Sequence, residues 1–218
     1  MKETPRVFDQ LARDYDHWYE KPFGRSVYAL ELSALRRVCR DFRRGLEVGV
    51  GTGRFALPLG IPYGADPSLE MLRLARKRGL TVVQAAGENL PFVTGGFDLV
   101  LLMVTLCFVD SPEAVLREAH RVLGPGGRLV LGLILRESPW AAFYQEKGRR
   151  GHPLYQRAHF YSLPELRELL SRTGFKEKRI LSTLFEPPQT ERPITNQEIR
   201  EGFHPQAGFF ILLALKSS

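Results

Sequence analysis

Apolar residues along this chain switch between helical spacing and short continuous runs. Over residues 27–42 they recur at three- and four-residue spacing, which predicts a helix. Residues 45–49 then form a short buried strand, followed by a glycine-rich turn. Residues 97–104 are almost continuously apolar, as expected for a central parallel strand that is buried on both faces. Further strands are predicted at residues 61–65, 80–85, 128–135, 175–185 and 208–216.

Helix-starting residues lie between these runs. Ser111-Pro112-Glu113 combines an N-cap serine, a proline at the first helical position and an acid in the first turn. Ser162-Leu163-Pro164-Glu165 has the pattern of a capping box. We expect Pro58 to stop a short helix near residues 54–57, and Gly79 to end the helix that opens at Asp66-Pro67-Ser68.

Strands that alternate with helices predict an α/β fold with a doubly wound, mostly parallel seven-stranded sheet of Rossmann-like type. The last two strands are joined without a helix, so we expect the last strand to be antiparallel. Residues 137–162 break the alternation and are expected to form a small inserted cap. The chain is predicted to be one domain with four parts: N-terminal helices at 1–43, a core at 44–136, the cap at 137–162, and a C-terminal helix and strands at 163–218.

Composition narrows the class of protein. The 218 residues are 44% hydrophobic and 25% charged, typical of a globular domain and not of a disordered, collagen-like or coiled-coil chain. No apolar run reaches the roughly 18 residues of a membrane span. The start is polar, so we expect no secretory signal and a cytoplasmic location. Cys39 and Cys107 are too few for a disulfide framework, and we expect no metal site.

The turn after the first strand carries the candidate chemistry. Residues 47–53 read Glu-Val-Gly-Val-Gly-Thr-Gly, and glycines let a ligand approach the backbone closely. Asp66, after the second strand, is placed to accept hydrogen bonds from ribose hydroxyls at the same sheet edge. An NAD site would have glycine or alanine three positions beyond Gly51, where this chain has Arg54. The pattern therefore favours an adenosine-containing ligand other than NAD.

At this motif the chain resembles the class I S-adenosylmethionine (SAM)-dependent methyltransferases, particularly small enzymes related to ubiquinone and menaquinone methyltransferases. The resemblance covers residues 5–136 and includes the glycine-rich turn at 121–127. It implies SAM as cofactor and S-adenosylhomocysteine as product. The cofactor-binding residues that it implies are Tyr15 and Trp18 on the first helix, Glu47, Gly49, Gly51 and Gly53 at the methionine part, Asp66, Pro67, Ser68 and Met71 at the ribose and adenine, Gly87, Glu88 and Asn89 at the adenine edge, and Thr105, Leu106 and Phe108 beside the sulfonium.

No motif identifies the methyl acceptor, which we expect to be a small molecule. Methyl transfer from a sulfonium depends mainly on orientation, so the lack of an evident general base does not argue against activity. The catalytic residues stay unassigned. Cys107 either lines the acceptor pocket or acts as a soft nucleophile, and the inertness of a buried apolar thiol argues against the second role. The candidates for the acceptor pocket are His17, Cys107, Tyr144, His152 and His159.

The formal charge of +7 leaves an RNA methyltransferase as one alternative and a noncatalytic SAM-binding module as another. The two densest basic clusters are expected at helix ends on the sheet edge opposite the cofactor, which argues against nucleic acid. These clusters are Arg36, Arg37, Arg40, Arg43 and Arg44, and Arg73, Arg76, Lys77 and Arg78. Selection of an acidic acceptor would instead involve Lys147, Arg149, Arg150 and Arg157. The oligomeric state is not predicted.

Overall fold

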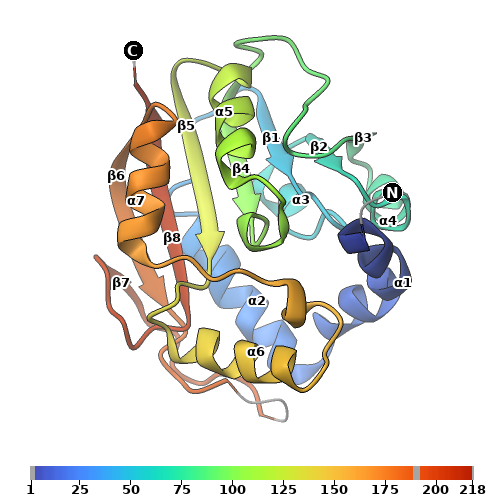
Figure 1. Cartoon of the computed structure of the whole chain (residues 1–218), viewed down its shortest axis with the longest axis vertical. Helices are drawn as coiled ribbons and strands as arrows, with labels where there is room; N and C mark the ends of the chain where they lie inside the picture. The colour runs from blue at the N-terminus through green and yellow to red at the C-terminus, as the bar shows by residue number, and fades with distance from the viewer. Residues whose placement is uncertain (1–2, 189–191, 218) are drawn as a thin grey trace.

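One mixed sheet organises the part of the chain that the computed structural model describes, residues 3–188 and 192–217 (Figure 1). Its strands are β1 (Gly45–Val48), β2 (Tyr63–Asp66), β3 (Thr81–Gln84), β4 (Phe97–Met103), β5 (Leu123–Leu133), β6 (Phe175–Thr183), β7 (Ile199–Glu201) and β8 (Phe209–Lys216). The strand order is β3-β2-β1-β4-β5-β8-β6-β7. Pairing is parallel from β3 to β5, and β8 is antiparallel to both β5 and β6. The doubly wound sheet and its antiparallel last strand are confirmed.

The described sheet has eight strands, not the predicted seven. The additional strand, β7, pairs antiparallel with β6, and its Ile199 lies opposite Thr183. Its three residues are half-buried or exposed at the edge of the sheet. A strand this short has no apolar alternation that a sequence pattern could detect.

Helices cover both faces of the sheet (Figure 1). They are α1 (Glu3–Trp18), α2 (Pro22–Leu35), α3 (Ala56–Leu59), α4 (Leu69–Lys77), α5 (Pro112–Val122), α6 (Pro139–Arg149) and α7 (Leu163–Arg172), with short 3-10 turns η1 (Leu106–Phe108) and η2 (Tyr155–Arg157). α5 and α7 pack on the face toward the viewer, and α2, α3 and α4 on the other face. The arrowhead end of β5 points toward α6 at the bottom of the view.

Strand β4 shows why both faces are buried. Leu99, Leu101 and Met103 pack into the core with residues of α2 and α4, whereas Val100 and Leu102 pack with residues of α5 and α7. Successive side chains of a strand point to opposite faces, so a continuous apolar run supplies two cores at once. Full burial of each such side chain contributes about 1.5–3 kcal/mol.

Two helix boundaries differ from the prediction. α2 starts at Pro22 and ends at Leu35, so the basic residues after it lie in the loop that leads to β1. Pro58 lies inside α3 instead of stopping it, because the first turn of a helix needs no backbone N–H from that position. Gly60, with φ of 73°, ends α3. The caps at Ser111 and Ser162 are confirmed, the latter with a complete capping box to Glu165.

Residues 137–162, the expected cap, contain α6 and η2. The two elements approach closely at Gly148, where a Cβ would lie 2.7 Å from the carbonyl oxygen of Tyr155. Trp140 of α6 stacks on Phe23 of α2, with ring centroids 5.9 Å apart. The segment is thereby packed onto α2 at the carboxyl end of the sheet. No helix in the described part of the chain is both long and apolar enough to cross a bilayer.

Candidate functional site

A cavity of about 370 Å³ lies at the carboxyl ends of β1, β2 and β4. Its volume falls within the roughly 300–1,000 Å³ of small-molecule sites. Its walls come from the glycine-rich turn, from the loops after β2, β3 and β4, and from α1, α2, α6 and η2. The predicted site residues that line it are Tyr15, Trp18, Gly49, Gly51, Asp66, Pro67, Met71, Gly87, Glu88, Thr105, Phe108, Tyr144 and His152.

The glycine-rich turn is packed tightly against the loop after β4. Gly49 has φ of 74°, and a Cβ on it would overlap the side chain of Thr105. Thr105 Oγ1 donates to the Val48 carbonyl oxygen at 3.1 Å. Val104 has φ of 51°, a left-handed conformation that is strained for a β-branched residue and is typical of functional loops. At Gly51, by contrast, the space for a Cβ is open.

Asp66 presents a buried carboxyl to the cavity. Its Oδ2 accepts from the Gly51 amide and its Oδ1 from the Ser68 amide, both at 2.9 Å. Burial raises the pKa of Asp66 to about 6, against the effect of these two hydrogen bonds. Each carboxylate oxygen can accept a further hydrogen bond, so the group can hold a pair of hydroxyls.

Glu47 lies beneath the turn instead of lining the cavity, and only 1% of it is exposed. Its Oε2 has no hydrogen-bond partner among the described residues. Burial raises the pKa of Glu47 well above its ordinary value, a hydrogen bond from the Ala56 backbone opposes this shift, and the Asp66 charge adds to it. A buried carboxyl with one unpaired oxygen calls for a donor from a ligand or water.

Four other predicted cofactor residues do not line the cavity. Gly53 packs against Leu80 and Ala75, where it allows α4 to approach the turn. Ser68 is the N-cap of α4, and its hydroxyl donates to Asp9 of α1 at 2.6 Å. Asn89 is exposed on the loop after β3, and Leu106 is the buried first residue of η1.

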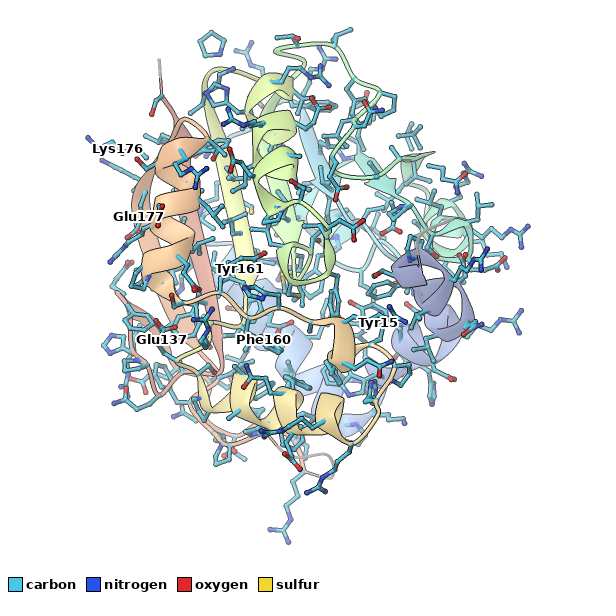
Figure 2. The ribbon with its side chains drawn as sticks, viewed as in Figure 1. Tyr15, Glu137, Phe160, Tyr161, Lys176 and Glu177 are labelled. Carbon is cyan, nitrogen blue, oxygen red and sulfur yellow. The ribbon has the colours of Figure 1, made fainter. Side chains whose placement is uncertain are left out.

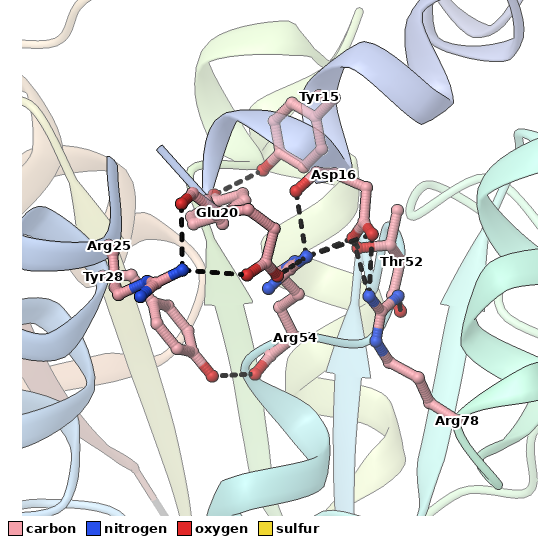
Figure 3. Close-up of polar contacts among 9 residues, drawn as sticks. Tyr15, Asp16, Glu20, Arg25, Tyr28, Thr52, Arg54 and Arg78 are labelled. Carbon is pink, nitrogen blue, oxygen red and sulfur yellow. Dashed lines mark hydrogen bonds and ion pairs between the residues drawn. The ribbon is translucent and has the colours of Figure 1, made fainter. Parts of the chain in front are cut away.

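An ion-pair network joins α1 to the glycine-rich turn (Figure 3). Asp16 of α1 accepts from Thr52 Oγ1 at 2.7 Å and from Arg54 Nε at 2.8 Å. Arg78 donates both to Asp16 and to the Thr52 carbonyl oxygen, the latter at 2.7 Å. The expectation that Arg78 is remote from the ligand edge is therefore wrong, because its side chain extends from the end of α4 to this turn.

Comparison with known proteins decides the family. A family model described as a methyltransferase domain matches residues 46–131. A SAM-dependent methyltransferase of Thermotoga maritima, described as a possible histamine N-methyltransferase, is 36% identical, with a TM-score of 0.89 over 98% of this chain and 100% of that one. This chain belongs to the SAM-dependent methyltransferases.

Two further relatives are similar in sequence. An uncharacterised protein of Mycobacterium tuberculosis is 43% identical over 94% of this chain and 72% of its own length. The demethylmenaquinone methyltransferase of Corynebacterium kroppenstedtii is 32% identical over 60% of this chain and 59% of its own. The resemblance drawn from the glycine motif is confirmed. This methyltransferase uses SAM as its cofactor, which excludes the NAD alternative.

Aromatic rings and one acid form a part of the cavity wall of the methyltransferase that we call the aromatic chamber. Its wall residues are Tyr15, Tyr19, Glu31, Trp140, Tyr144 and Tyr155. Figure 2 shows Tyr15 on the side of α1 nearest η2. Of these six, the sequence prediction named Tyr15 and Tyr144 as site residues and placed Trp140 and Tyr155 in the cap, but it missed Tyr19 and Glu31. The sequence did contain a signal for Glu31. This residue lies four positions after Val27 and four before Leu35, so it is an acid on the apolar stripe of α2.

The other candidates for the acceptor pocket lie in three different places. His152 lines the cavity and packs on Tyr155, with ring centroids 4.5 Å apart, and burial lowers its pKa. Cys107 and His159 line a separate pocket of about 20 Å³ on the other side of the β4 loop. Burial raises the pKa of Cys107 to about 12, so its thiol is inert. His17 is exposed at the end of α1 and lines neither pocket.

None of the four basic residues expected to select an acidic acceptor lines the cavity. Lys147 lies over the Phe143 ring at 4.6 Å, and Arg149 and Arg150 form ion pairs with Glu146, each at 2.8 Å. Among the residues that the structure describes, no group of His, Cys, Asp and Glu side chains could hold a metal ion.

Proposed function

We propose that this methyltransferase transfers the methyl group of SAM to a small organic molecule held in the aromatic chamber. The observation that carries the proposal is the continuity of one cavity, which reaches from Asp66 and the glycine-rich turn to Glu31 and the rings around it. SAM, when bound, supplies a methyl group on a sulfonium sulfur. An electron pair of the acceptor attacks the methyl carbon in line, and the sulfur leaves as a thioether.

Asp66 and Glu47 suit the two polar ends of SAM. The buried Asp66 carboxyl has acceptor capacity for two ribose hydroxyls. The unpaired Glu47 Oε2 beneath the turn can accept from the amino group of the methionine part, directly or through water. Met71 and Phe108 supply apolar walls for the adenine. The Gly51 position, open to the cavity, lets the ligand lie against the backbone.

The chain contributes orientation and exclusion of water. α1 and α6 cover the carboxyl end of the sheet, so an acceptor in the chamber is enclosed on several sides. Holding two reactants in line is worth up to about 7–11 kcal/mol of the barrier. The whole cavity, which would hold both SAM and the acceptor, has the volume of a small-molecule site, and this favours a small acceptor over RNA.

Release of S-adenosylhomocysteine across an acceptor panel tests the proposal. The Thermotoga maritima relative's description names histamine, and the Corynebacterium relative's name indicates a demethylmenaquinone, so an amine and a naphthoquinol both belong in the panel. Total RNA forms a separate arm. We expect turnover with at least one small molecule and none with RNA. Turnover with RNA alone would overturn the proposal, and SAM binding without any turnover would indicate a noncatalytic module.

A further inference from the structure

A buried carboxyl faces the aromatic chamber without a protein cation to neutralise it. Glu31 of α2 is 7% exposed and lines the cavity. Within residues 3–188 and 192–217, its carboxylate has neither a hydrogen bond nor an ion pair. Desolvation is the cause of a pKa raised to about 8. A carboxyl in this position lacks a partner that a bound ligand could supply.

Aromatic rings surround this carboxyl. The Tyr15 and Tyr19 hydroxyls are 2.9 Å apart, and the rings of Tyr144 and Tyr155 are 4.4 Å apart between centroids. Burial raises the pKa values of Tyr19 and Tyr144, and the charge of the nearby Glu31 carboxyl raises them further. The phenols therefore stay neutral, and their rings present the electron-rich faces that attract a cation.

The remaining charges on the cavity wall have the same sign. Its acidic residues come from α1, α2, the last position of β2 and the loops after β3 and β4. No described lysine or arginine lines it, although the chain carries a charge of +7. An anionic acceptor would be repelled from this wall, and a neutral one would leave Glu31 without a counter-ion. The acids are Asp14, Glu31, Asp66, Glu88 and Asp110.

We propose that the methyl acceptor is an organic amine and that its ammonium group forms an ion pair with Glu31 inside the aromatic chamber. This inference rests on the proposed function, because it assigns the acceptor to the same cavity. It makes Glu31 a binding residue for the acceptor. Before transfer the ammonium gives one proton to the Glu31 carboxylate, and the freed nitrogen electron pair attacks the methyl carbon while the sulfur leaves as a thioether. The carboxylate supplies charge and direction, and the rings of Tyr15, Tyr19, Trp140, Tyr144 and Tyr155 enclose the cation and its organic substituent.

A neutral quinol is the rival acceptor, because a protonated Glu31 could donate a hydrogen bond to an oxygen of such a ring. The unpaired Glu31 carboxyl favours the amine, since it gives an ammonium in the chamber a counter-charge and offers a neutral quinol no comparable gain. Removal of the Glu31 charge should weaken the binding of an amine and leave the binding of a neutral acceptor nearly unchanged. The experiment below measures this difference.

The test is isothermal titration calorimetry on the protein saturated with S-adenosylhomocysteine, which requires no turnover. The probes are isosteric pairs in three sizes: butylamine with butanol, phenethylamine with 2-phenylethanol, and tryptamine with tryptophol. 1,4-Naphthohydroquinone represents the rival. The variants are Glu31→Gln, which keeps the shape and removes the charge, and Glu168→Gln, which removes an exposed carboxylate from α7.

We expect at least one amine to bind ten times more tightly than its alcohol. Glu31→Gln should abolish this preference, with the alcohol and S-adenosylhomocysteine affinities within threefold of wild type, which also shows that the variant folds. Glu168→Gln should preserve the preference. The inference is overturned if no amine binds at millimolar concentration, if amine and alcohol bind alike, or if Glu31→Gln leaves the preference intact. Turnover of a naphthoquinol in the acceptor panel would then still uphold the proposed function.

Discussion

Arg78 Nη2 donates to both carboxylate oxygens of Asp16, at 2.9 and 2.8 Å. The contact joins the end of α4 to α1, and Arg54 and Thr52 donate to the same carboxylate (Figure 3). Because Arg78 also donates to the Thr52 carbonyl oxygen, the position of α1 depends directly on the conformation of the glycine-rich turn.

We predict that Asp16→Asn loosens α1 over the cavity. The amide keeps the size of the side chain but loses charge-assisted hydrogen bonds, so the free energy of unfolding should fall by about 1–3 kcal/mol. Hydrogen exchange should be faster in α1, and S-adenosylhomocysteine affinity should fall. Arg13→Gln, an exposed change on the same helix, is the control and should leave both unchanged. Equal exchange in Asp16→Asn and wild type would show that the network does not hold the helix.

The same network predicts an acid dependence of stability. Burial alone would raise the pKa of Asp16, but hydrogen bonds from Arg54, Arg78 and Thr52 hold it at about 2, below the ordinary 3.8. A lowered pKa in the folded state means that the stabilisation is complete above about pH 4 and is lost as the pH falls toward about 2. Urea unfolding should therefore show a gap between wild type and Asp16→Asn at pH 6 that narrows by pH 2.5. A constant gap would contradict this assignment.

Asp66→Ala should weaken SAM binding by about 1–3 kcal/mol, the magnitude expected when charge-assisted hydrogen bonds are lost. Asp66 also accepts from Gly51 and Ser68, so part of the loss comes from a less ordered turn. Asp66→Asn separates the two effects, because it keeps one acceptor oxygen for the turn. Calorimetry with SAM gives the affinities, and an unchanged value in both variants would remove Asp66 from the site.

Gly49→Ala and Gly60→Ala form a matched pair. The two glycines have φ of 74° and 73°, so an alanine at either position incurs the left-handed penalty of about 1–2 kcal/mol. Only at Gly49 does the new Cβ overlap another side chain, that of Thr105. Thermal and urea unfolding should thus show a larger loss of stability for Gly49→Ala. Similar losses of stability in the two variants would mean that the Thr105 side chain moves away from the new Cβ at little cost in free energy.

Local sequence determined the elements and the cofactor end of the site. The capping box at Ser162, the apolar run of β4 and the glycine-rich turn followed by Asp66 each depend on residues close together in the chain. Periodicity and turn chemistry act over the same short range, so these features could be predicted. β7 could not, because its pairing with β6 is made across a long loop.

The acceptor end was decided by tertiary structure. Glu31 has the sequence context of a core position on α2, and it faces a cavity only because α1, α6 and η2 enclose that face. Cys107 lies in the turn after β4 and His159 follows η2, and the hydrogen bond from the His159 amide to the Cys107 carbonyl oxygen at 2.9 Å brings both to a different pocket. Arg78 reaches the glycine-rich turn because its side chain is long and Asp16 stabilises its charge there. Sequence alone therefore determined the family and its cofactor, whereas burial and charge in the chamber arise from contacts between segments far apart in the chain.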